Sequence, residues 1–102
     1  MHSRRARLLC VGNERDHLQS RCDVLNFSGY DAKSATVRQA EILLRTEKFA
    51  LVIVSAFLSQ AERERVVSAA GETPTLVLEG LTFAPQLLPQ VERLLQPTHL
   101  NL

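Results

Sequence analysis

The chain has 102 residues, of which 45% are hydrophobic and 23% are charged, and its formal net charge is +1. These values are ordinary for one small globular domain, and the near-neutral charge does not favour a nucleic acid, a membrane or an acidic substrate as partner. No apolar run approaches the ~20 residues of a membrane span, and the two cysteines are too few for a disulfide framework. We therefore expect a single domain over residues 1–102 in a reducing cytoplasm, with flanking segments at 1–6 and 97–102.

The first half of the chain predicts two strand–helix units. Residues 7–11 (RLLCV) are an apolar run that is typical of a buried strand. Asn13 is a suitable N-cap for a helix through about Phe27, and Gly29 is suited to the position just after the helix end. Residues 30–35 alternate weakly and are polar enough for an edge strand, and a second amphipathic helix then ends near Lys48. Helical spacing turns two sets of side chains toward the sheet: Leu18, Cys22 and Leu25 in the first helix, and Val37, Ala40 and Leu44 in the second.

The second half predicts two more units. Residues 49–54 (FALVIV) show no alternation, which indicates a strand buried on both faces. The capping box Ser59-Gln60-Ala61-Glu62 begins a third helix. Residues 75–78 predict a fourth short strand. A last helix runs to about Gln96, and we expect Pro89 in its first turn because proline has no N–H to donate. The core stripe expected for this helix is Leu87, Leu88, Val91, Leu94 and Leu95. Strands that alternate with helices predict an α/β fold with a parallel sheet and four strand–helix units.

Three segments of the chain resemble the receiver domains of two-component response regulators. Residues 7–18 (RLLCVGNERDHL) match the common receiver opening RILVVDDEPDLL without a gap, and residues 49–55 (FALVIVS) match the segment DLVILD. Residues 81–85 (LTFAP) match the segment KPF. The resemblance implies a flavodoxin-like open sheet with strand order 2-1-3-4 between two layers of helices. It also implies that one helix and one strand are missing between Gly80 and Leu81, so that the receiver is truncated.

The same resemblance implies a receiver pocket without its reactive groups. The acidic pair that holds the divalent cation in the family falls on Gly12 and Asn13, and the phosphoacceptor aspartate falls on Ser55. The family's hydroxyl residue falls on Glu79, and its lysine falls on Leu81. The degenerate pocket comprises Gly12, Asn13, Glu14, Ser55, Glu79 and Leu81. Phosphorylation of an aspartate needs a carboxylate, Mg²⁺ and a cation, so we expect no enzymatic activity, metal or cofactor.

These features favour a non-phosphorylatable pseudo-receiver that acts as a signalling or protein-interaction module in a two-component-like phosphorelay. With the fifth strand absent, residues 75–78 lie at the sheet edge without a lysine to block pairing. We therefore expect a homodimer built from the fourth strand and the last helix, although the alternating tail 98–102 could cover the same edge. The candidate interface residues are Leu76, Val77, Leu78, Phe83, Leu87, Leu88 and Val91.

Two alternatives stay open. The IIB components of the sugar phosphotransferase system are similar in size and carry a phosphocysteine just after the first strand, near the position of Cys10. The residues that follow it include Glu14 and Asp16, which would repel a phosphate group, and Cys10 itself lies within an apolar run. The other alternative is a structural domain whose only role is self-association. We expect Cys10 and Cys22 to be buried and unpaired, and the scattered histidines show no metal-ligand spacing.

Overall fold

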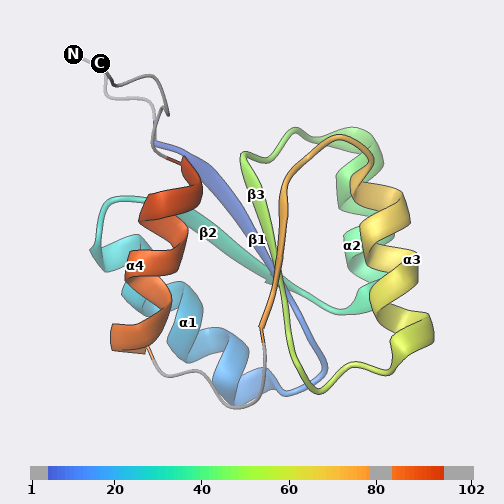
Figure 1. Cartoon of the computed structure of the whole chain (residues 1–102), viewed down its shortest axis with the longest axis horizontal. Helices are drawn as coiled ribbons and strands as arrows, with labels where there is room; N and C mark the ends of the chain where they lie inside the picture. The colour runs from blue at the N-terminus through green and yellow to red at the C-terminus, as the bar shows by residue number, and fades with distance from the viewer. Residues whose placement is uncertain (1–4, 79–83, 96–102) are drawn as a thin grey trace.

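The computed structural model describes residues 5–78 and 84–95, which form a four-stranded parallel sheet with helices on both faces (Figure 1). The strands are β1 (Arg7–Val11), β2 (Asp31–Ala35), β3 (Leu51–Val54) and β4 (Thr75–Val77), and the helices are α1 (Arg15–Phe27), α2 (Val37–Thr46), α3 (Gln60–Ala70) and α4 (Ala84–Leu95). The strand order β2-β1-β3-β4 confirms the predicted topology. Helices α1 and α4 cover one face of the sheet, and α2 and α3 cover the other. None of the described helices is long and apolar enough to cross a bilayer.

The central strands β1 and β3 are buried on both faces. Residues 8–11 and 51–54 are each at most 1% exposed. Successive side chains of a strand point to opposite faces, so Leu9 and Val52 pack into the α2/α3 layer, whereas Leu8 and Leu51 pack into the α1/α4 layer. Full burial of such a side chain stabilises the fold by about 1.5–3 kcal/mol. The apolar runs predicted to be buried strands are therefore confirmed as the centre of the core.

Two helices begin with reciprocal caps. The Ser59 hydroxyl accepts a hydrogen bond from the Glu62 N–H (3.1 Å), and the Glu62 carboxylate accepts one from the Ser59 N–H (2.9 Å). This confirms the predicted capping box at the start of α3. Thr36 and Gln39 form the same arrangement at the start of α2, with distances of 3.2 and 3.0 Å. Each arrangement satisfies N–H groups that have no partner within the helix.

Helix α1 begins differently from its prediction. Its N-cap is Glu14 rather than Asn13, and the Glu14 side chain makes no capping hydrogen bond. The Asn13 side chain instead interacts with the Glu62 carboxylate at the start of α3. At the other end, Gly29 follows the C-cap Ser28 with φ of 104°. This is the left-handed conformation that favours glycine after a helix.

Helix α4 departs most from expectation. Pro89 lies in its second turn rather than its first, because the helix already begins at Ala84. An interior proline costs about 3 kcal/mol, and the full burial of Leu87 and Val91 on this helix, worth about 1.5–3 kcal/mol each, offsets that cost. The rest of the expected core stripe divides into the partly buried Leu88 and Leu95 and the exposed Leu94.

In the edge strand β2, a side chain forms hydrogen bonds with backbone groups that face away from the sheet. The Asn26 side chain accepts a hydrogen bond from the Ala32 N–H (2.7 Å) and donates one to the Ala32 carbonyl (3.2 Å). Ala32 faces away from β1, because the neighbouring Asp31 N–H donates to the Ala6 carbonyl on that side. The asparagine at the end of α1 therefore pairs with β2 as a neighbouring strand would.

At the opposite edge of the sheet, the backbone N–H and carbonyl groups of alternate β4 residues face β3. The Pro74 carbonyl accepts a hydrogen bond from β3, and the Leu78 N–H donates one to β3, both at 2.9 Å. In a parallel ladder the backbone groups of alternate residues face the same neighbour, so Leu76 also faces β3 and the two residues that flank it do not. The N–H and carbonyl groups of Thr75 and Val77 therefore face away from the sheet.

The caps of α2 and α3 should contribute measurably to stability. We expect Thr36→Ala and Ser59→Ala each to lower the free energy of unfolding by about 1 kcal/mol, because each leaves a helix N–H without its partner. Urea denaturation followed by circular dichroism measures this change. Ser68→Ala, on the exposed surface of α3, is the matched control, and a loss no larger than that of the control would contradict the role of the caps.

Candidate functional site

Ser55 lies immediately after β3 at the carboxyl edge of the sheet. Its N–H donates to the Val11 carbonyl (2.9 Å), so the ends of β1 and β3 are held together here. The side chain accepts a hydrogen bond from the Phe57 N–H (3.2 Å), and the residue is only 3% exposed. The hydroxyl oxygen is therefore a buried acceptor within its own turn.

Gly12 is packed directly against Ser55. A Cβ atom at Gly12 would lie 2.9 Å from the Ser55 Cβ and 3.2 Å from Leu18 Cδ2. Both distances are shorter than ordinary van der Waals contact, so any larger residue at position 12 must displace its neighbours. The sequence resemblance puts a metal-binding carboxylate at this position, and the structure leaves no room for one.

The polar residues that follow Gly12 have partners of their own. Asn13 and Glu14 are exposed, and Glu14 Oε1 lies 2.9 Å from His17 Nδ1. The Ser59 N–H and, with it, the Asn13 side chain hold the pKa of the Glu62 carboxyl below its usual range. In residues 5–78 and 84–95, no group of three or more His, Cys, Asp or Glu side chains could hold a metal ion.

Two further positions of the predicted pocket, Glu79 and Leu81, lie outside the described residues, as does the candidate interface residue Phe83. The roles predicted for them remain predictions. A small hollow of about 180 Å³ lies beside the pocket, where β1 and β2 end and α2 begins, and no charged side chain lines it. The described part of the carboxyl edge therefore offers neither a carboxylate at position 12 or 13 nor a free hydroxyl.

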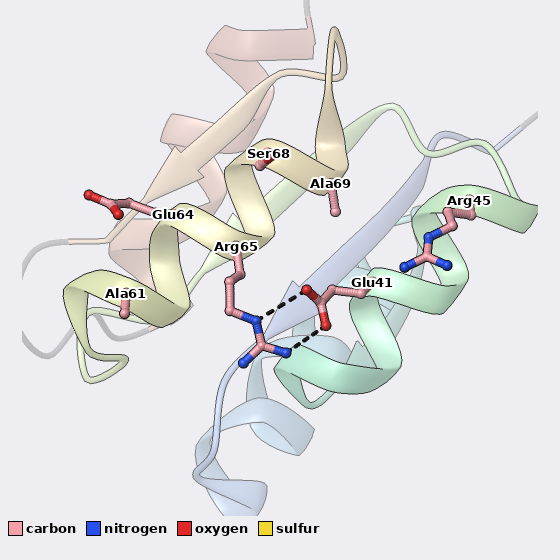
Figure 2. A pocket seen from close by; sticks show the side chains of 7 residues that line it. All are labelled: Glu41, Arg45, Ala61, Glu64, Arg65, Ser68 and Ala69. Carbon is pink, nitrogen blue, oxygen red and sulfur yellow. Dashed lines mark hydrogen bonds and ion pairs between the residues drawn. The ribbon is translucent and has the colours of Figure 1, made fainter.

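A larger hollow of about 550 Å³ lies between α2 and α3 (Figure 2). The Arg65 guanidinium spans it and donates two hydrogen bonds to the Glu41 carboxylate, at 2.6 and 3.1 Å. This bond lowers the pKa of Glu41 and raises that of Arg65. Since the two charges already satisfy each other, we read the pair as a brace between neighbouring helices rather than as a binding site.

Cys10 lies within β1 and is fully buried. A hydrogen bond with Cys22, followed by burial, raises the pKa of the Cys10 thiol well above its ordinary value. A nucleophilic cysteine needs the opposite, a stabilised thiolate. The phosphocysteine alternative is therefore not favoured, whereas both cysteines are buried and free of disulfides, as predicted.

The candidate interface residues occupy three different environments. Leu78, Leu87 and Val91 are at most 3% exposed and pack in the core of the α1/α4 layer. Leu76 and Leu88 are partly buried against the same core. Val77 is 39% exposed. Among the described members of this set, Val77 is thus the one that offers substantial apolar surface to a partner.

When the chain is compared with known proteins, the matches are to solved structures and not to sequences. No protein-family model and no curated protein sequence matches the chain. A CheY-like response regulator receiver domain from Methylobacillus flagellatus matches with a TM-score of 0.68 and 14% identity, over 89% of this chain and 99% of that one. NtrX from Brucella abortus, solved in complex with ADP, matches with a TM-score of 0.66 and 18% identity, over 90% of this chain and 27% of that one. The chain has the fold of a response regulator receiver domain.

In this receiver fold, the contact between Asn13 and Glu62 was not anticipated from the sequence. The two residues lie far apart along the chain, and they meet because the loops that follow β1 and β3 lie at the same edge of the sheet. The receiver topology could have suggested this proximity, but nothing in the residue spacing indicates the hydrogen bond. The capping pair of Thr36 and Gln39, in contrast, is visible as a T-x-x-Q pattern.

The close approach of Gly12 to Ser55 has a measurable consequence. We expect Gly12→Ala to lower the free energy of unfolding by about 1–3 kcal/mol, because the added methyl group overpacks the contact with Ser55 and Leu18. In a protein that already carries Ser55→Gly, the same Gly12→Ala substitution should lower the free energy of unfolding by much less, because the Ser55 side chain is no longer there to clash. Chemical denaturation of the four proteins measures the coupling, and additive effects would contradict a direct steric contact.

Proposed function

We propose that this protein is a non-phosphorylatable pseudo-receiver that works as a protein-interaction module in two-component signalling. The observation that carries the proposal is the contact between Gly12 and Ser55. A Cβ added at Gly12 would lie 2.9 Å from the Ser55 Cβ, which leaves no room for a carboxylate side chain at the position where a receiver would hold its metal. The receiver fold supports the signalling context, and the lack of room for a carboxylate at position 12 supports action by contact rather than by chemistry.

The chemistry of the pocket supports the same proposal. Mg²⁺ holds its water tightly and needs one or two carboxylates in its coordination shell, but positions 12, 13 and 55 carry none. A serine hydroxyl becomes a nucleophile when an adjacent base takes its proton. Ser55 is only 3% exposed, and its side-chain oxygen accepts a hydrogen bond from the N–H of Phe57, which is a donor and not a base. Ser55 thus has neither the access nor the activation that phosphorylation requires.

Treatment with a phosphoryl donor tests this proposal. We expect no mass gain after incubation with acetyl phosphate and Mg²⁺, measured by intact mass spectrometry, while a phosphorylatable receiver treated in parallel gains one phosphoryl group. A titration with Mg²⁺ should likewise leave the amide resonances of Gly12, Asn13 and Ser55 in place. A phosphoryl adduct on any residue, or saturable shifts at these three amides, would overturn the proposal.

We also propose that the module self-associates through the edge of β4. The outward backbone groups of Thr75 and Val77 can pair with the same groups of a second copy around a two-fold axis. The strand carries no charge and no internal proline, which are the usual devices against such pairing. Val77 on β4 is 39% exposed, so apolar surface accompanies the strand edge. The buried Leu78, Leu87 and Val91 support this surface from within and are not its contacts.

Sedimentation velocity at micromolar concentration tests the self-association. We expect the unmodified protein to sediment as a dimer and Val77→Lys to sediment as a monomer, because a lysine at the centre of a paired edge introduces like charges across the axis. Ile42→Lys on α2 is the matched control, since Ile42 is another exposed apolar residue, at 56%, away from this edge. A monomeric unmodified protein would contradict the proposal, as would equal dissociation by both variants.

A further inference from the structure

The outward residues of β4 are spaced so that the strand can pair with a second copy of itself. The backbone groups of Thr75 and Val77 face away from β3, and those of Leu76 between them face β3. In an antiparallel pair of strands, opposite residues that exchange both backbone hydrogen bonds alternate with opposite residues that exchange none. A second β4 strand therefore pairs with the first in those antiparallel registers that place two outward residues opposite each other.

Each residue of β4 is the centre of one such register, and the three registers differ in the hydrogen bonds they form. When the axis lies at Leu76, Thr75 of each copy is opposite Val77 of the other, so the outward groups of both residues pair in both copies. An axis at Thr75 puts Val77 opposite Thr73, whose N–H already donates to the last residue of α3 (3.0 Å). An axis at Val77 puts Thr75 opposite position 79, which is beyond the end of β4. The register centred on Leu76 is thus the one that uses the whole outward edge within β4.

The strand alone is too short to hold two copies together. β4 has three residues, and a specific interface buries about 800 Å² on each partner, which is far more than the backbone edge of three residues supplies. Residues that lie opposite each other in an antiparallel ladder point to the same face of the sheet. The α2/α3 layers of the two copies therefore lie on one face of the joined sheet, and helices beside β4 have to supply the remaining contact.

Helix α3 has a free flank on the β4 side of the sheet. α2 contacts β1 and β2, whereas α3 contacts β3, so the flank of α3 that faces away from α2 lies toward β4 in the order β2-β1-β3-β4. Arg65 marks the flank that faces α2, since it binds Glu41 (Figure 2), and Val66 is fully buried in the core. Each residue turns a helix by about 100°, so Val67 lies on the flank opposite to Arg65. This valine is 41% exposed and offers apolar surface there.

We propose that two copies join their β4 strands antiparallel around a two-fold axis at Leu76, and that their α3 helices pack against each other along the flank that carries Val67. This arrangement rests on the self-association proposed through β4 and adds its register and a second contact. The product is a continuous sheet that contains the four strands of each copy. The two Leu76 side chains meet on its α1/α4 face, and the two α3 helices meet on the other.

Isotope-filtered nuclear Overhauser spectroscopy on dimers of carbon-13-labelled and unlabelled chains tests the register, because it detects protons of one copy that lie close to protons of the other. We expect an effect between the Hα protons of Leu76 and the partner's Leu76, since opposite residues without mutual hydrogen bonds have Cα atoms about 4.5 Å apart. An effect between Leu76 and the partner's Leu78 would place the axis at Val77, and one between Leu76 and the partner's Pro74 would place it at Thr75. Either result would overturn the register and leave the self-association through β4 intact.

A charge on the flank of α3 tests the helix contact. We expect Val67→Lys to raise the dissociation constant of the dimer about tenfold or more in sedimentation velocity, because it sets like charges near each other across the axis. Ser68→Lys is the matched control, since Ser68 is equally exposed on α3 but lines the hollow on the α2 side, and it should change the constant less than about twofold. Equal effects of the two variants would overturn the helix contact, whereas an unmodified chain that stays monomeric would contradict the self-association itself.

Discussion

The structure depends on the burial of β1 and β3 from both sides. Because their side chains alternate between two faces, each strand needs a helical layer above it and another below it. The parallel crossovers supply these layers, with α1 and α4 on one face and α2 and α3 on the other (Figure 1). The same constraint brings the ends of the two strands together, so that Gly12 and Ser55 meet without space between them.

This contact determines what the carboxyl edge of the sheet can do. In an open α/β sheet, the loops at this edge are the common place for ligands and chemistry. Here the groups that reach it are used within the protein, since Ser55 closes its own turn and Asn13 joins Glu62 of the α3 cap. In the described residues, these groups join the two loops that follow β1 and β3 to each other.

The sequence was sufficient for the architecture because its signals are local. The unbroken apolar runs of β1 and β3, the Ser59 capping box and Gly29 each determine structure within a few residues. Helix α4 was less predictable, since the position of Pro89 depends on how Leu87 and Val91 pack against distant elements. The sequence indicated which residues follow β1 and β3 at the candidate site, but not how closely their atoms pack. No pattern of residue types reveals that position 12 lacks room for a side chain.

The side chain of Asn26 makes the two edges of the sheet different. By occupying both backbone groups of Ala32, it blocks part of the β2 edge, whereas no hydrogen bond from within residues 5–78 and 84–95 reaches the outward groups of Thr75 and Val77 on β4. A sheet with two open edges can add copies head to tail without limit and form fibres. If two copies pair through β4 as proposed, the Asn26 side chain hinders the addition of a further copy at Ala32 of the β2 edge, which favours a closed dimer over a fibre.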